Sequence, residues 1–199
     1  MLSFLLITLA AQADPALPTT VFLVRHAEKA TGEAPPLTKA GLARAANLGK
    51  VFTDASVDAV FTTDLCRTAQ TADPVARIHA LPLQVLPLTG TDLATCVPAL
   101  TQPIQPLPKT DDGTADLVAR VRGMPAGSTV FVAGPSNTVP GLVEALGAPS
   151  LCPAVLALDE EGRCWLGHDD YDDLFVVTIP GEGAPGALRG ARGRAGWDG

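Results

Sequence analysis

Short apolar runs alternate along the chain with longer stretches in which apolar residues recur at helical spacing. The short runs predict strands near residues 20–25, 57–62, 81–86, 129–133, 153–158 and 174–179. The longer stretches predict helices near residues 38–53, 65–78, 114–123 and 137–147. This alternation is typical of a three-layer α/β/α sandwich, in which a mostly parallel six-stranded sheet carries helices on both faces.

The first apolar run breaks abruptly into charge. Val21–Val24 reads as a strand buried on both faces, and Arg25 and His26 follow where it would leave the sheet. Ligands of open α/β sheets bind outside the carboxyl ends of the strands. A guanidinium can grip two phosphate oxygens and an imidazole can attack phosphorus, so the pair suits a phosphate site. Taken alone, however, such a pair at a strand end is often only a surface feature.

A second arginine follows the second strand. Asp64 is placed to cap the helix near 65–78, which puts Arg67 in the first turn of that helix. There a phosphate would meet both the side chain and the free backbone N–H groups of the helix start. The alternative is a solvated helix arginine, which is the commoner role. Further along the same helix, Pro74 would kink or shorten it unless the helix ends nearby.

Five segments of the chain, taken in order, resemble the histidine phosphatase family. They are Val21–Lys29, with the Arg-His pair; Leu37–Gly41, with a Leu-Thr-x-x-Gly helix start; Phe61–Ala72, with the second arginine; Val130–Gly147, with Ser-Asn-Thr-Val-Pro; and Asp170–Pro180, a closing strand. The last two resemble a secreted bacterial branch of the family. Together the segments extend from about Thr20 to Pro180, so the resemblance covers nearly all of the predicted domain.

The resemblance implies a sheet with one antiparallel strand and a phosphomonoesterase that needs no metal and no other cofactor. His26 would form a phosphohistidine intermediate, while Arg25 and Arg67 hold the phosphoryl oxygens of a small phosphorylated substrate. The family commonly takes its proton donor from the region after the third strand. Asp92 is the nearest candidate there, and a solvated loop aspartate is the equally frequent alternative.

One position departs from the family. A second catalytic histidine would precede Ser-Asn-Thr-Val-Pro, and this chain has Pro135 there. Ser136 and Asn137 can still cap the following helix and bind phosphate beside its free N–H groups. Proline supplies no donor, and loss of one oxyanion donor costs about 3 kcal/mol. Two functions therefore stay open: a weakened phosphatase, or a catalytically impaired protein that binds a phospholigand or an envelope partner.

Two further histidines are alternatives for the missing one. His79 precedes the third strand, and the prediction is a surface position on the far side from the site. His168 lies in an acidic loop ahead of the last strand, where solvent exposure is favoured over a place in the pocket. The aspartates around His168 lack the spacing of an EF-hand loop, so they are interpreted as a solvated turn.

Composition limits the class of partner. With 199 residues, of which 47% are apolar, the chain can bury one substantial core. Its formal net charge of −7 argues against a general nucleic-acid or anionic-membrane binder. A phosphate site must therefore be a local basic region on an acidic surface. The oligomeric state is not predicted by any of these patterns.

The two ends of the chain are predicted to lie outside the folded domain, which spans 14–180. Residues Met1–Ala13 carry no charged side chain and end in the small-x-small pattern Ala11-Gln12-Ala13, so they are interpreted as the signal peptide of a secreted or periplasmic protein. The apolar run is too short to span a bilayer. An apolar tail or a misplaced start codon is the alternative. The glycine- and arginine-rich tail, 181–199, is predicted to be disordered.

Four cysteines fit the same oxidising compartment. Cys66, Cys96, Cys152 and Cys164 lack C-x-x-C spacing, which disfavours a zinc site or a thioredoxin-like redox motif. Of the three pairings, Cys66–Cys96 with Cys152–Cys164 is favoured. The second bond would close a small loop between two apolar runs, and the first would tie a long proline-rich loop to the site. Four free buried thiols are the alternative.

Overall fold

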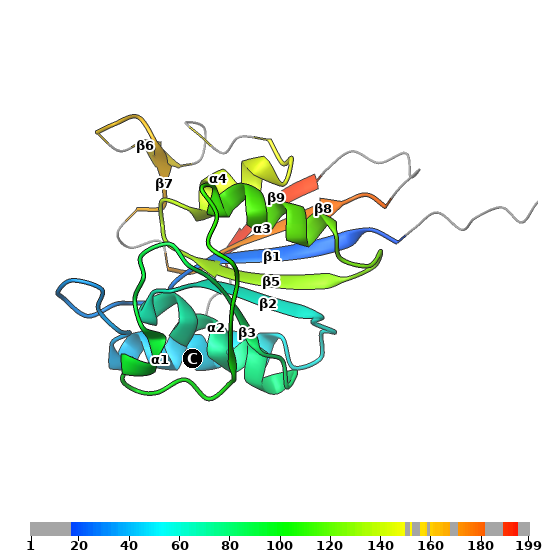
Figure 1. Ribbon diagram of the computed structural model, residues 1–199. Coiled ribbons are helices and arrows are strands. Elements are labelled where there is room, and N and C mark those ends of the chain that lie inside the picture. Colours follow the sequence, from blue (N-terminus) through cyan, green and yellow to red (C-terminus); the bar gives the residue numbers. More distant parts are fainter. Residues whose placement is uncertain are drawn as a thin grey trace, which may run out of the picture.

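A central sheet with helices on both faces forms the body of the protein (Figure 1). The computed structural model describes residues 17–149, 152, 156–158, 160–167, 171–181 and 189–194. Within these residues the sheet has seven strands: β1 (Thr19–Arg25), β2 (Ala59–Thr63), β3 (Leu83–Leu86), β4 (Ile104–Pro106), β5 (Thr129–Gly134), β8 (Asp173–Ile179) and β9 (Arg189–Arg194). Helices α1 (Lys39–Val51) and α2 (Cys66–Ile78) cover one face, and α3 (Gly113–Arg122) and α4 (Val139–Ala145) cover the other. The predicted three-layer architecture is confirmed.

The strand order is β4-β3-β2-β5-β1-β8-β9. The pairs from β4 to β1 are all parallel, whereas β8 runs antiparallel to both β1 and β9, as the resemblance implied. The sheet has seven strands and not the expected six, because β4 and β9 were not predicted and the strand predicted near 153–158 lies outside it. Strand β9 also contradicts the predicted disorder for Arg189–Arg194, since backbone pairing needs no apolar side chains. The rest of that tail and the interpreted signal peptide lie outside the described residues.

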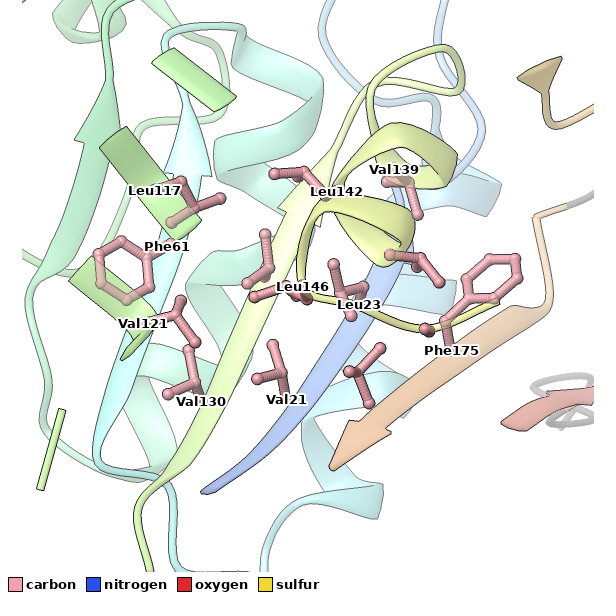
Figure 2. Close-up of a cluster of buried hydrophobic side chains, with 14 of the residues drawn as sticks. Val21, Leu23, Phe61, Leu117, Val121, Val130, Val139, Leu142, Leu146 and Phe175 are labelled. Carbon is pink, nitrogen blue, oxygen red and sulfur yellow. The ribbon is translucent and has the colours of Figure 1, made fainter. Parts of the chain in front are cut away.

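Successive residues on each inner strand face opposite helix layers and so build two cores. Val130 of β5 lies in one core cluster with Leu142 of α4 and with Leu146, the residue that directly follows this helix (Figure 2). The next residue, Phe131, points to the other face, where its ring meets that of Phe52 edge-on with centroids 5.2 Å apart. Because β5 and β1 are buried on both sides, they read as continuous apolar runs, and for this reason the sequence predicts them well.

The predicted strand near 153–158 does not join the central sheet. Its described part, β6 (Ala157–Leu158), pairs instead with β7 (Cys164–Trp165) in a separate two-stranded sheet. A disulfide between Cys152 and Cys164 closes this small unit, with Cα atoms 5.8 Å apart. The short hairpin satisfies its backbone groups locally, so the segment needs no place in the large sheet.

Helices α1 and α2 approach each other closely at a glycine. A Cβ on Gly49 would come within 2.9 Å of the Cβ of Pro74. Pro74 neither ends nor shortens α2, which continues through it to Ile78. Thr38 caps α1 by accepting a hydrogen bond from Gly41 N–H at 3.0 Å. Among the described residues, none of the helices has the length and apolar character needed to cross a membrane.

The favoured pairing of the other two cysteines is also confirmed. Cys66, the first residue of α2, is bonded to Cys96, with Cα atoms 5.5 Å apart. Cys96 directly follows a short 3-10 helix, η1 (Leu93–Thr95). Both cysteines are buried. The disulfide therefore fixes the loop after β3 to the start of the helix that carries Arg67.

Replacing Cys66 and Cys96 together by alanine should lower the free energy of unfolding. The bond spans 30 residues, and chain-entropy models assign about 3 to 4 kcal/mol to a loop of that length. Urea unfolding of wild type and the double variant at one pH would measure the loss. Equal stabilities would show that the bond constrains the unfolded chain far less than its loop length requires.

Candidate active site

The end of β1 places Arg25 and His26 against the end of β5. Arg25 is in register with Gly134, and the backbone N–H of His26 donates to the Gly134 carbonyl at 3.0 Å. Both side chains are almost fully buried, with 4% and 2% of their surfaces exposed. The parallel pairing of β1 and β5 thus brings the predicted nucleophile and its neighbouring arginine beside the segment that carries Pro135.

The imidazole of His26 is held in one tautomer. Its Nδ1 lies 2.7 Å from the carbonyl oxygen of Ala27. A carbonyl only accepts, so Nδ1 carries the proton and Nε2 keeps its lone pair. Burial lowers the pKa of His26 to about 4; the Ala27 hydrogen bond opposes this shift, and the positive charges of Arg25, Arg67 and Lys29 add to it. At neutral pH the ring is therefore uncharged and keeps a free lone pair on Nε2.

Arg67 lies in the first turn of α2, at the same sheet edge. Burial, and then the positive charge of Arg25, lowers the pKa of Arg67, although a guanidinium stays protonated at neutral pH. Its Nε is buried and has no hydrogen-bond partner among the described residues. A buried donor of this kind is uncommon. Two neighbouring guanidinium groups with such a donor suit an anionic ligand.

The guanidinium of Arg25 is enclosed by the segment before β8. Its Nη1 donates to the carbonyl of Gly167, and its Cζ lies 4.3 Å from the centre of the Tyr171 ring. The same ring lies 6.2 Å from the imidazole of His26. Tyr171 is thus a site residue that the sequence reasoning missed. Tyr171 lies in the closing-strand segment Asp170–Pro180 that resembles the family, but nothing in the local sequence placed it beside Arg25.

An ion pair supports the segment after His26. Arg44 of α1 approaches Glu28 with its Nε 2.9 and 3.0 Å from the two carboxylate oxygens. Although burial acts to raise the pKa of Glu28, the hydrogen bonds from Arg44 hold that pKa below its usual range. The carboxylate therefore stays ionised, and the ion pair with Arg44 fixes the backbone that directly follows the His26 segment.

Asp64 does not cap α2 as the sequence predicted. The N-cap is Leu65, without a side-chain hydrogen bond. The Asp64 carboxylate instead accepts hydrogen bonds from the backbone of Leu88, Thr89 and Gly90. Three backbone donors stabilise a buried carboxylate more than a single cap bond would, and they fix the loop that follows β3.

The segment after β5 also differs from the expected cap. Helix α4 begins at Val139, and neither Ser136 nor Asn137 caps it. The carbonyl of Pro135 accepts the backbone N–H groups of Thr138 and Val139, each at 3.1 Å. Pro135 is buried and directly follows Gly134, whose carbonyl accepts the hydrogen bond from the His26 N–H. Ser136 and Asn137 follow Pro135 at the sheet edge, and their binding of phosphate is still a prediction.

Two of the remaining candidates, Asp92 and His79, have no described contact with Arg25 or Arg67. Asp92 is exposed and caps η1 by accepting from Ala94 N–H at 2.9 Å, and no described contact joins it to Arg25, His26 or Arg67. His79 follows α2 and its Nε2 lies 3.0 Å from the carbonyl of Phe52, at the opposite edge of the sheet as predicted. His168 lies outside the described residues.

Comparison with known proteins supports a phosphatase-like fold. Residues 21–88, which include Arg25, His26 and Arg67, match the family profile described as Histidine phosphatase superfamily (branch 1). Solved structures with the same fold include a candidate alpha-ribazole-5'-P phosphatase from Escherichia coli, at 19% identity over 89% of this chain and 97% of that chain, with a TM-score of 0.56. No curated protein gives a significant match.

Two further solved structures cover nearly as much of the chain. One is a mycobacterial glucosyl-3-phosphoglycerate phosphatase, at 15% identity over 89% of this chain and 99% of that chain, with a TM-score of 0.52. The other is a mutant phosphoserine phosphatase from Entamoeba histolytica in complex with phosphoserine, at 14% identity over 87% and 95%, also with a TM-score of 0.52. At these identities the likeness shows a shared fold.

The buried imidazole should make the protein less stable in mild acid. The pKa of His26 falls from 6.5 to about 4 on folding, so the unfolded chain binds the proton more readily. Stability from this group is complete above about pH 6.5 and is lost as the pH falls toward 4, by on the order of 3 kcal/mol. Urea unfolding of wild type and His26→Gln between pH 7 and 4, in phosphate-free buffer, would isolate the effect. Parallel pH profiles for the two proteins would contradict it.

Proposed function

We propose that this chain is a secreted member of the histidine phosphatase superfamily that hydrolyses phosphomonoesters through His26. The observation that carries the proposal is the state of the His26 ring. It is neutral because burial lowers its pKa to about 4, and its Nδ1–H is fixed on the Ala27 carbonyl. The lone pair on Nε2 is therefore available for attack near Arg25 and Arg67, whose charges act on the imidazole and suit a phosphate.

The proposed reaction has two displacements at phosphorus. In the first, the Nε2 lone pair of His26 attacks, an N–P bond forms, and the P–O bond to the leaving group breaks. A general acid gives the leaving oxygen its proton. In the second, water attacks phosphorus, the N–P bond breaks, the base formed in the first step takes the proton of water, and inorganic phosphate leaves. No metal or other cofactor takes part in this scheme.

Arg25 and Arg67 hold the phosphoryl oxygens in this proposal. The Arg25 guanidinium is fixed by the Gly167 carbonyl and the Tyr171 ring, so little side-chain freedom is lost when phosphate binds. Arg67 contributes a buried Nε donor without a described partner. Ser136 and Asn137, at the same sheet edge, are the further proposed phosphate ligands. The substrate class is a small phosphorylated molecule.

Pro135 favours a second candidate function. Its side chain has no donor, and it occupies the position where the family has its second catalytic histidine. In this alternative the protein binds phosphate or a phospholigand through the arginines without efficient turnover, and acts as a binding or interaction protein of the cell envelope. Both functions require phosphate affinity, so only a measurement of turnover or of the phosphoenzyme can separate them.

A secreted or periplasmic location is part of the proposal. It is supported by the two disulfides, Cys66–Cys96 and Cys152–Cys164, because such bonds persist in oxidising compartments. The interpreted signal peptide, Met1–Ala13, agrees with that location.

Mature wild type should hydrolyse an aryl phosphate slowly, and His26→Ala should not hydrolyse it at all. Rapid acid-free quenching after mixing with a labelled aryl phosphate should trap a phosphoenzyme that acid destroys, and this species should be absent from His26→Ala. Replacing Pro135→His should raise the rate by roughly a hundredfold to a thousandfold, because it restores a donor for the developing charge. EDTA should leave all three rates unchanged.

The outcomes separate the two candidate functions. A silent wild type that binds phosphate in calorimetry, and becomes active in Pro135→His, would establish the binding protein instead of the enzyme. Labelling of His26→Ala equal to that of wild type would show that another residue is the nucleophile. Loss of activity in EDTA would overturn the metal-free reaction.

Asp92 is the proposed general acid, although in the structure its carboxylate caps η1. It borders a cavity of about 270 Å³ together with Asp64, three residues before Arg67. Asp92→Asn should slow hydrolysis of alkyl phosphates much more than that of a nitrophenyl phosphate, whose leaving group needs no proton. Equal slowing of both substrates would mean that Asp92 acts only as a cap.

A further inference from the structure

Thr71 connects the two halves of the candidate site through its hydroxyl. It lies one turn after Arg67 on α2, and 1% of its surface is exposed. The hydroxyl oxygen lies 3.0 Å from the backbone nitrogen of Ala27 and 2.7 Å from the carbonyl oxygen of Arg67. One buried group thus contacts the residue after the nucleophile and the residue that supplies the second arginine.

Each hydrogen bond in this arrangement has a fixed direction. The Ala27 nitrogen can only donate and the Arg67 carbonyl can only accept, so the Thr71 hydroxyl accepts from the first and donates to the second. On its other side, the carbonyl of Ala27 accepts the Nδ1–H of His26 at 2.7 Å. A continuous chain of hydrogen bonds therefore extends from the imidazole, through Ala27 and Thr71, to the backbone of Arg67.

We propose that Thr71 is a positioning residue, which fixes the spacing of the His26 imidazole relative to Arg67 by bridging Ala27 N–H and the Arg67 carbonyl. The inference rests on the proposed function, because spacing matters only if His26 attacks a phosphoryl group that Arg67 holds. Displacement of a reacting group by about 1 Å can cost a hundredfold in rate. Thr71 does not itself contact the reacting atoms in this proposal.

Removal of the hydroxyl would release the chain of hydrogen bonds at its centre. Thr71→Val keeps the volume and the branched shape but leaves the Ala27 N–H buried without a partner. The backbone at Ala27 would then shift to bring this N–H to another acceptor, and the Ala27 carbonyl, which belongs to the next peptide unit, would be displaced with it from Nδ1 of His26. Both tautomers of the ring would then be populated, and the orientation of the ring relative to Arg67 would be less restrained.

The same helix provides a matched control. Thr68 is fully buried, and its hydroxyl bonds Thr63 and the carbonyl of Leu65 but no part of the nucleophile segment. Thr68→Val therefore removes a buried hydroxyl from α2 by the identical exchange. It should lower stability about as much as Thr71→Val without reaching Ala27.

The test compares hydrolysis of an aryl phosphate by wild type, Thr71→Val, Thr71→Ser and Thr68→Val. We expect kcat to fall about a hundredfold in Thr71→Val and to stay within about threefold of wild type in the other two, because Thr71→Ser keeps the hydroxyl. A folded Thr71→Val with wild-type kcat overturns the inference, as does an equal loss in Thr68→Val. If Thr71→Val does not fold, Thr71→Ala takes its place against Thr71→Ser.

A second readout separates this inference from the proposed function. Nitrogen-15 NMR of the free protein should show His26 protonated at Nδ1 in wild type and in Thr71→Ser, and a mixture of tautomers in Thr71→Val. If wild type shows no turnover, the proposed function fails, and the NMR result alone decides the role of Thr71. An unchanged tautomer in Thr71→Val then overturns it.

Discussion

A neutral imidazole can be buried only where its single N–H has an acceptor, and His26 finds that acceptor in the carbonyl of the next residue, Ala27. The arrangement works only if the backbone around it is held. The N–H of His26 is bound by Gly134 at the end of β5, and that of Ala27 by Thr71 on α2. A sheet pairing and a helix contact must therefore both form before the His26 imidazole, the proposed nucleophile, has its charge state and direction.

Helix α2 extends the same principle to the loops around the site. Its buried polar side chains bind backbone groups of segments that have no regular structure of their own. Gln70 accepts from Leu37 N–H ahead of α1, and Asp73 accepts from Thr101 N–H ahead of β4. Buried polar groups are costly unless paired, and these are paired with loops that would otherwise be free to move. The helix that carries Arg67 thus also holds the surroundings of Arg67.

Arg25 and His26 stand at the end of one buried strand and Arg67 begins the helix after the next, so parallel pairing brings them to one edge of the sheet. It was the resemblance to the histidine phosphatase family that distinguished them from ordinary surface residues in the sequence. The edge strands β4 and β9 have no continuous apolar run in the sequence, because backbone pairing at the edge of a sheet does not require apolar side chains. Tyr171 was missed because its contact with Arg25 depends on how distant segments meet, which no local spacing encodes. Asp64 was predicted to cap α2, but its carboxylate instead accepts hydrogen bonds from three backbone N–H groups of the loop after β3, which is distant in sequence.

The effect of Pro135 depends on which state of the reaction a second histidine would stabilise. In the proposed reaction, Arg25 and Arg67 would meet the charge that a phosphate already carries, and so would contribute to ground-state binding. A donor at position 135 would act mainly on charge that develops during the displacement, and interactions of that kind raise kcat without lowering KM. Its absence should therefore leave phosphate affinity nearly intact while lowering the rate constant. If the proposal holds, the same site would bind phosphate as an active enzyme does but turn over slowly, so the rate of the chemical step, and not affinity, is the quantity that separates the two proposed functions.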